Sequence, residues 1–213
     1  MIFIDFEGFK DKPSSFVGYK FKGNFKQIIL DSELKEICLD QKMEYLSFEN
    51  FCKFIVNLSK ESECNLVAYG ELEKKQIESI TKENFGYMDV HKLIKKKVKA
   101  EYQKEHANMK EYWDGQKKTK DGKPNPTYKK GGFNKKRWKL STMLKLFRYP
   151  GYNPKTSGEG LTTKRLRSVI QALNTTRGTL TPVQKGKFTK LKKHNKVDVE
   201  GLEFLYKQLQ HKI

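Results

Sequence analysis

IFIDFEG at residues 2–8 is the stretch that decides the fold of this 213-residue chain. Its first five residues, IFIDF at 2–6, are predicted to form a short strand, and acids stand at the alternate positions 5 and 7. Successive side chains of a strand point to opposite faces, so Phe3, Asp5 and Glu7 share one face and the apolar even-numbered residues share the other. The stretch therefore predicts a first strand that carries two carboxylates on one side.

Two further strands are predicted directly after it. FVGYKF at residues 16–21 and FKQIIL at residues 25–30 are rich in apolar and aromatic residues. A short turn around Gly23 separates them and predicts an antiparallel hairpin. We expect the first strand to pair with the second in the same way, across residues 8–15.

The pattern then changes to strands that alternate with helices. Apolar residues recur at helical spacing over residues 47–60, with Ser47 as the N-cap, and a second helix is predicted over residues 71–82. Short strands are predicted at residues 65–70 and 87–90. Antiparallel strands followed by helix-linked strands predict an α/β fold, in which a mixed sheet is covered by helices.

The charges of the chain are unevenly distributed. The formal net charge is +19, but residues 1–91 have a net charge of −4, whereas residues 92–148 have +14 and residues 149–213 have +9. An acidic half joined to a strongly basic half indicates a polyanionic partner, with nucleic acid the leading candidate. The alternative is a lysine-rich surface that serves solubility.

Residues 92–180 are predicted to form a basic helix and loop insertion within a single domain of residues 1–213. A helix is expected over residues 91–110 and a return helix near residues 135–148. The loop between them, at residues 112–135, lacks apolar periodicity. This loop could close over bound nucleic acid or be disordered, and the sequence leaves both open.

Three helices are predicted in the C-terminal tail. The first begins at Thr162 and ends near Asn174. The second begins at Thr181, where a capping-box spacing is combined with Pro182 at the first helical position. The third is expected over residues 195–210, where apolar residues form one stripe.

Cations and aromatic residues are interleaved in the basic half. This combination is typical of proteins that bind single-stranded RNA or DNA, because cations follow the phosphate backbone and aromatic rings stack on bases. The alternative is that about half of these aromatic residues belong to the core of a helical elaboration. The candidate nucleic-acid-binding residues are Lys95, Lys96, Lys99, Trp113, Tyr128, Lys135, Arg137, Trp138, Lys164, Arg165 and Arg167.

The carboxylates of Asp5 and Glu7 are the first candidate metal ligands. Two like charges on one face of an otherwise apolar strand are costly to bury unless a cation neutralises them. Oxygen ligands of this kind suit Mg²⁺ or Mn²⁺. The alternative is a strand end that reaches solvent.

Two further groups of polar residues follow in the chain. Glu71 and Glu73 follow a predicted buried strand, at the strand end where α/β proteins usually bind ligands. Glu71 can serve the helix dipole, which leaves Glu73 as the ligand candidate. His194 and Asp198 have the i, i+4 spacing that shares a helix face, and we expect them at the start of the last helix. There the alternative is an acid that complements the dipole and a histidine at the surface.

The order of these three motifs resembles that of the DEDD 3′→5′ exonuclease superfamily, which has a ribonuclease H-like fold. FIDFEG at residues 3–8 looks like its first motif, NLVAYGELE at residues 65–73 like its second, and HNKVDVEGL at residues 194–202 like its third. The third motif is most similar to the Tyr-x-x-x-Asp version. The resemblance covers roughly residues 1–91 and 190–210.

The resemblance implies a nuclease that hydrolyses phosphodiester bonds of single-stranded nucleic acid with two divalent cations, Mg²⁺ or Mn²⁺. Asp5, Glu73 and Asp198 would hold one cation, and Asp5 and Glu7 the other, while His194 would orient or deprotonate the attacking water. The chain departs from the family in two positions. Glu73 replaces the commoner aspartate, and His194 stands where the Tyr class has tyrosine.

Two other functions compete with the exonuclease. One is a ribonuclease H-like module that has lost catalysis and binds RNA or DNA, and the other is a basic structural protein of a ribonucleoprotein. The chain has no run of about 18 apolar residues, so no membrane span is expected. The N-terminus carries two acids and no basic region, so no signal peptide is expected, and three scattered cysteines fit the reducing cytoplasm.

Overall fold

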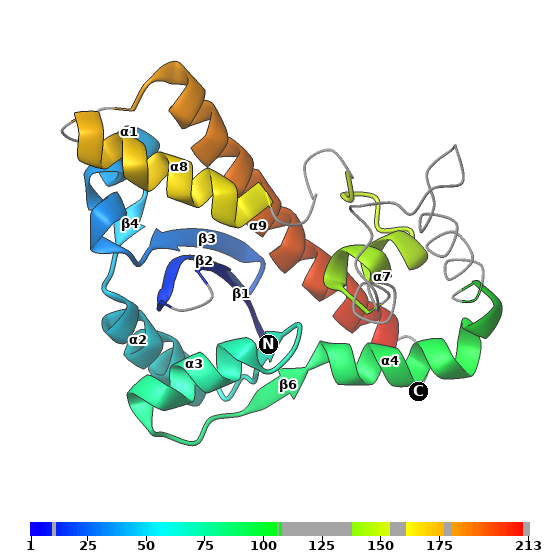
Figure 1. Cartoon of the computed structure of the whole chain (residues 1–213). Coiled ribbons are helices and arrows are strands. Elements are labelled where there is room, and N and C mark those ends of the chain that lie inside the picture. Colours follow the sequence, from blue (N-terminus) through cyan, green and yellow to red (C-terminus); the bar gives the residue numbers. More distant parts are fainter. Residues whose placement is uncertain (10–11, 106, 108–137, 154–160, 177–179, 211–213) are drawn as a thin grey trace, which may run out of the picture.

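The structure of the protein is a computed structural model, shown in Figure 1. It describes residues 1–9, 12–105, 107, 138–153, 161–176 and 180–210. The loop predicted over residues 112–135 lies outside the described residues.

The described helices and strands follow the predicted order, with additions between the third strand and the first helix. They are β1 (Ile2–Gly8), β2 (Ser14–Phe21), β3 (Asn24–Ile29), the 3₁₀ helix η1 (Ser32–Ile37), α1 (Cys38–Gln41), β4 (Glu44–Tyr45), α2 (Phe48–Glu61), β5 (Leu66–Ala68), α3 (Leu72–Thr81), β6 (Tyr87–Asp89), α4 (Val90–Glu101), α7 (Leu140–Leu146), α8 (Leu161–Thr176) and α9 (Pro182–Gln210).

One six-stranded sheet organises the molecule, with the strand order β4-β3-β2-β1-β5-β6. Strands β1, β2 and β3 pair antiparallel, whereas β5 pairs parallel with β1 and β6 pairs parallel with β5. The short strand β4 adds to the other edge, parallel to β3. The prediction of an α/β fold with a mixed sheet, antiparallel first and parallel later, is confirmed.

The side chains of β1 point alternately to the two faces of the sheet, and each face has its own hydrophobic core. The even-numbered apolar residues Ile2, Ile4 and Phe6 pack with α2 and α3 on one face of the sheet. The opposite face is covered by α9, which crosses the sheet diagonally, and by α8 (Figure 1). Phe3 lies in the core beneath α9, so the face that carries Asp5 and Glu7 is the face toward α9.

Part of the predicted insertion belongs to this second core. Val90, Ile94 and Val98 of α4 and the apolar residues of α7 pack with Phe3 and α9. Helix α4 ends at Glu101, the described residues 103–105 and 107 are again helical, and α7 begins at Leu140; the parts of both predicted helices between residues 108 and 137 lie outside the described residues.

The C-terminal tail differs from the prediction. The helices predicted to begin at Thr181 and near residue 195 are one helix, α9, of 29 residues. Thr181 caps it as predicted, since its backbone N–H and side-chain hydroxyl both donate to Gln184 Oε1. The prediction that His194 and Asp198 open a helix is therefore wrong, because both lie in the middle of α9, away from its dipole ends.

None of the helices in the described residues is both long enough and apolar enough to cross a lipid bilayer.

Candidate metal centre

Three separate segments bring acids together beside α9. Strand β1 contributes Asp5 and Glu7, the turn after β5 leads into α3 with Glu73, and α9 contributes His194 and Asp198. The strand β1 lies between β2 and β5, so its acids are at the centre of the sheet. The five residues predicted as catalytic thus come from elements that meet at one place.

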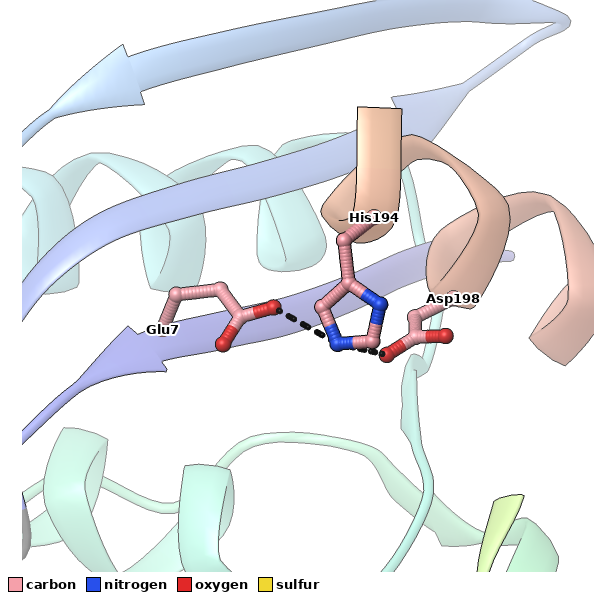
Figure 2. Close-up of side chains that lie close together, drawn as sticks. All are labelled: Glu7, His194 and Asp198. Atoms are coloured by element: carbon pink, nitrogen blue, oxygen red, sulfur yellow. Dashed lines mark ion pairs between the residues drawn. The ribbon is translucent and has the colours of Figure 1, made fainter. Parts of the chain in front are cut away.

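Glu7, His194 and Asp198 form the tightest group. His194 Nε2 lies 3.3 Å from Asp198 Oδ2 and 3.7 Å from Glu7 Oε1, and Figure 2 shows the imidazole between the two carboxylates. One ligand atom from each residue lies within 4.8 Å of the others, and the group is largely buried. These three residues can hold a metal ion. Asp5 and Glu73 do not belong to this closest group.

Asp5 is held by a side chain that the sequence analysis did not single out. Asn195 Nδ2 donates to Asp5 Oδ2 at 2.8 Å and also to the Asp5 backbone carbonyl at 3.0 Å. Asn195 is 0% exposed. Asp5 is therefore fixed at both its side chain and its backbone by α9.

The turn before α3 directs Glu73 inward and Glu71 outward. Gly70 has a φ of +126°, a conformation that favours glycine, and its carbonyl accepts a hydrogen bond from Tyr87. Glu73 is 7% exposed, whereas Glu71 is exposed and pairs with Lys92. The structure thus makes Glu73, and not Glu71, the buried acid of this turn.

Burial, and after it like charge, raises the pKa of the acids Asp5, Glu7 and Glu73. Burial and then the charges of Glu7, Asp198 and Glu73 raise the pKa of Asp5 well above its ordinary value, and the Asn195 hydrogen bond partly opposes this. Burial, followed by Asp198 and Glu73, also raises the pKa of Glu7. Burial raises the pKa of Glu73 to about 7, with a smaller contribution from Asp89. Four acids thus share one poorly hydrated region.

The residues present fit a hard divalent cation. Among the described residues, Glu7 Oε1 and Glu73 Oε2 are buried and have no hydrogen-bond partner. Buried carboxylate oxygens without donors are costly, and a cation satisfies them while it removes the like-charge repulsion. Carboxylates together with one imidazole form a donor set that Mg²⁺ or Mn²⁺ accepts.

Trp138 agrees with the alternative that part of the aromatic residues of the basic half belong to a core. Its side chain is only 9% exposed and packs in the core with Phe3 and α9, so its ring is not available for stacking on a base. Lys95 Nζ lies 5.5 Å from the ring centroid. Lys96 and Lys99 of the same helix are exposed.

Helix α8 carries two arginines of the predicted nucleic-acid-binding set, Arg165 and Arg167. Helix α8 packs against β1 and α9, and the Arg167 guanidinium lies 5.8 Å from the ring of Phe9, two residues after Glu7. Arg165 is half-buried, and within the described part of the chain its Nη1 is buried without a hydrogen-bond partner. A buried guanidinium nitrogen without an acceptor favours an anionic ligand.

The remaining predicted nucleic-acid-binding residues cannot be placed. Trp113, Tyr128, Lys135 and Arg137 lie outside the described residues, and so does the side chain of Lys164.

The sequence analysis missed Asn195 and its neighbours Gln27 and Gly18, although one signal was present. Leu191, Asn195 and Val199 follow one another at i, i+4 spacing, so the amide occupies a position of the apolar stripe of α9. A polar residue at a core position needs a buried partner.

Comparison of the chain with protein-family models, with curated proteins and with solved structures finds no match.

Proposed function

We propose that this protein is a metal-dependent 3′→5′ exonuclease that hydrolyses phosphodiester bonds of single-stranded RNA or DNA. The observation that carries the proposal is the convergence of Asp5, Glu7, Glu73 and Asp198, buried beside His194, with two carboxylate oxygens that lack donors in the described structure. The choice of an exonuclease comes from the resemblance of the three motifs to the DEDD superfamily.

The architecture supports the same proposal. A sheet in which β1, β2 and β3 are antiparallel neighbours and β5 and β6 continue parallel to β1 is compatible with a ribonuclease H-like fold. The acids lie on the first strand, after the first parallel strand and on the last helix, in the order that the superfamily motifs have along the chain.

The proposed roles follow from the positions of the residues. Glu7 and Asp198 would hold one cation beside His194, and Asp5 and Glu73 would supply oxygens for a second. Two bound cations would lower the pKa of the attacking water and stabilise charge on the leaving oxygen. His194 would orient that water or accept its proton, since its Nε2 faces the carboxylates. Arg165 would bind a phosphate of the strand.

The test is a gel assay on single-stranded RNA and DNA labelled at the 5′ end, with Mg²⁺, Mn²⁺ or EDTA. Glu7→Gln and Asp198→Asn keep the shape of the side chain and remove one charge each. We expect a ladder that shortens from the 3′ end, requires metal and slows about a hundredfold in either variant. Glu200→Gln is the matched control, because Glu200 lies on the same helix and pairs with Lys196.

The other outcomes separate the rival functions. Internal cuts that require metal would keep the metal centre and exclude the exonuclease. Tight binding without cleavage, unchanged by EDTA and by both substitutions, would replace the proposal with a nucleic-acid-binding module. Cleavage that survives Asp198→Asn at the wild-type rate would show that the activity does not come from this site.

A further inference from the structure

A row of residues crosses the sheet beneath α9. Asp5 of β1 is paired with Gly18 of β2, and Gly18 is paired with Gln27 of β3. Asn195 bridges the two outer members of this row. Its Nδ2 donates to Asp5, and its Oδ1 accepts a hydrogen bond of 3.1 Å from Gln27 Nε2.

The middle of the row is shaped for this amide. A Cβ atom at Gly18 would lie 2.0 Å from Asn195 Oδ1 and 2.9 Å from its Cγ, so any larger residue would displace the side chain. Gln27 is itself anchored, because its Nε2 also donates to the backbone carbonyl of Lys192 at 2.8 Å. The position of the amide is thus fixed from the sheet and from the helix.

Asparagine is well suited to this position. The bridge needs a donor toward Asp5 and an acceptor toward Gln27, and an amide provides both. Aspartate would add a fifth carboxylate to the site, and an aliphatic residue would leave Asp5 and Gln27 without their bonds. Packing alone therefore does not account for a buried amide in the apolar stripe of α9.

We infer that Asn195, seated over Gly18 and anchored by Gln27, is a positioning residue that holds the Asp5 carboxylate in its cation-binding orientation. The inference rests on the proposed metal centre and adds to it a residue that does not contact the cation. Outer residues that orient metal ligands typically change metal affinity by about 10–100-fold when they are removed.

Mn²⁺ binding to the purified protein, measured by titration calorimetry without nucleic acid, tests the inference. We expect Asn195→Ala to raise the Kd for Mn²⁺ about tenfold. Gln27→Ala, which loosens the same amide from the other side, should raise it by a smaller factor and serves if Asn195→Ala does not fold. Ser59→Ala is the control, because it also removes a buried hydrogen bond, from Ser59 Oγ to the Cys64 carbonyl. This bond is far from Asp5 and Asn195 in the sequence.

The outcomes distinguish this inference from the proposed function. Suppose that the wild-type protein binds Mn²⁺ through Asp198 and that folded Asn195→Ala and Gln27→Ala bind it with an unchanged Kd. This result would overturn the positioning role and leave the metal centre intact. A Kd that rises equally in Ser59→Ala would attribute the effect to lost stability and overturn it as well. Wild-type protein that binds no Mn²⁺ would overturn the metal centre itself.

Discussion

Glu73 is the acid of the site whose pKa is shifted mainly by burial and to a value close to neutral. Its pKa is raised to about 7 by burial and by Asp89, from an ordinary value of 4.5. A carboxyl group whose pKa is higher in the folded than in the unfolded protein contributes stability that is fully present at pH values below its pKa in the unfolded chain. That stability is lost as the pH rises through the folded pKa.

We therefore predict that the metal-free protein becomes less stable between about pH 4.5 and pH 7.5, and that Glu73→Gln removes about 3 kcal/mol of this decline. The decline is measured as the free energy of unfolding by urea, in EDTA and at several pH values. Glu71→Gln, two residues away, is the control, because Glu71 is exposed and its pKa is lowered by Lys92. Parallel stability curves for wild type and Glu73→Gln would contradict the prediction.

Single residues of the site differ in how well the sequence predicts them. Asp5 and Glu7 can be placed from alternation alone, since a strand sends both side chains to one face. The position of Glu73 depends in addition on the conformation of the turn at Gly70. Asn195 cannot be placed without the tertiary structure, because its partner Asp5 is 190 residues away in the chain and the hydrogen bond leaves no local pattern.

At the scale of elements, the close approach of α9 to β2 depends on Gly18. A methyl group there meets the Asn195 amide, and the ring of Phe25 is 3.2 Å away. We predict that Gly18→Ala lowers the free energy of unfolding by about 2 kcal/mol in the wild type. In the Asn195→Ala background the clash with the amide is gone and only the Phe25 ring must move by a few tenths of an ångström, so the loss should fall below about 1 kcal/mol.

Urea unfolding of the four proteins of this double-mutant cycle measures the coupling. An equal cost of Gly18→Ala in both backgrounds would show that the amide does not limit the approach of α9.

The elements with strong local signals were predicted, and the others were not. The hairpin of β2 and β3, α2 with its Ser47 cap, β5 and β6 all follow from periodicity and turn residues. Strand β4 has two residues and exists only through its pairing with β3, so no periodicity could indicate it. The continuity of α9 was missed because polar residues around His194 resemble a helix start, whereas Asn195 uses its side chain for a tertiary contact.

At the scale of the whole molecule, the uneven charge along the chain becomes a difference between the two faces of the sheet. The acidic residues 1–91 supply the sheet with α2 and α3, and the basic remainder supplies α4, α7, α8 and α9 on the opposite face. The acid cluster faces this basic layer. A nucleic acid attracted by the lysines and arginines would therefore arrive at the face that holds the carboxylates.

We predict that Arg165→Gln weakens the binding of single-stranded nucleic acid severalfold, irrespective of its sequence, and lowers the salt dependence of log K by about one. Fluorescence anisotropy at several salt concentrations measures both. Lys53→Gln makes the same charge change on α2, on the other face, and should leave binding unchanged. Equal losses in the two variants would mean that only net charge matters.

The span of chain between β1 and α9 also orders events in time. The strand with Asp5 and Glu7 is synthesised before α9, and Asn195 is added 190 residues after Asp5. At about 5–20 residues per second, that interval is roughly 10–40 s. A nascent or truncated chain that lacks α9 has no Asn195 to hold Asp5 and no Asp198 beside Glu7, so the cluster can form only after residues 182–210 have been made.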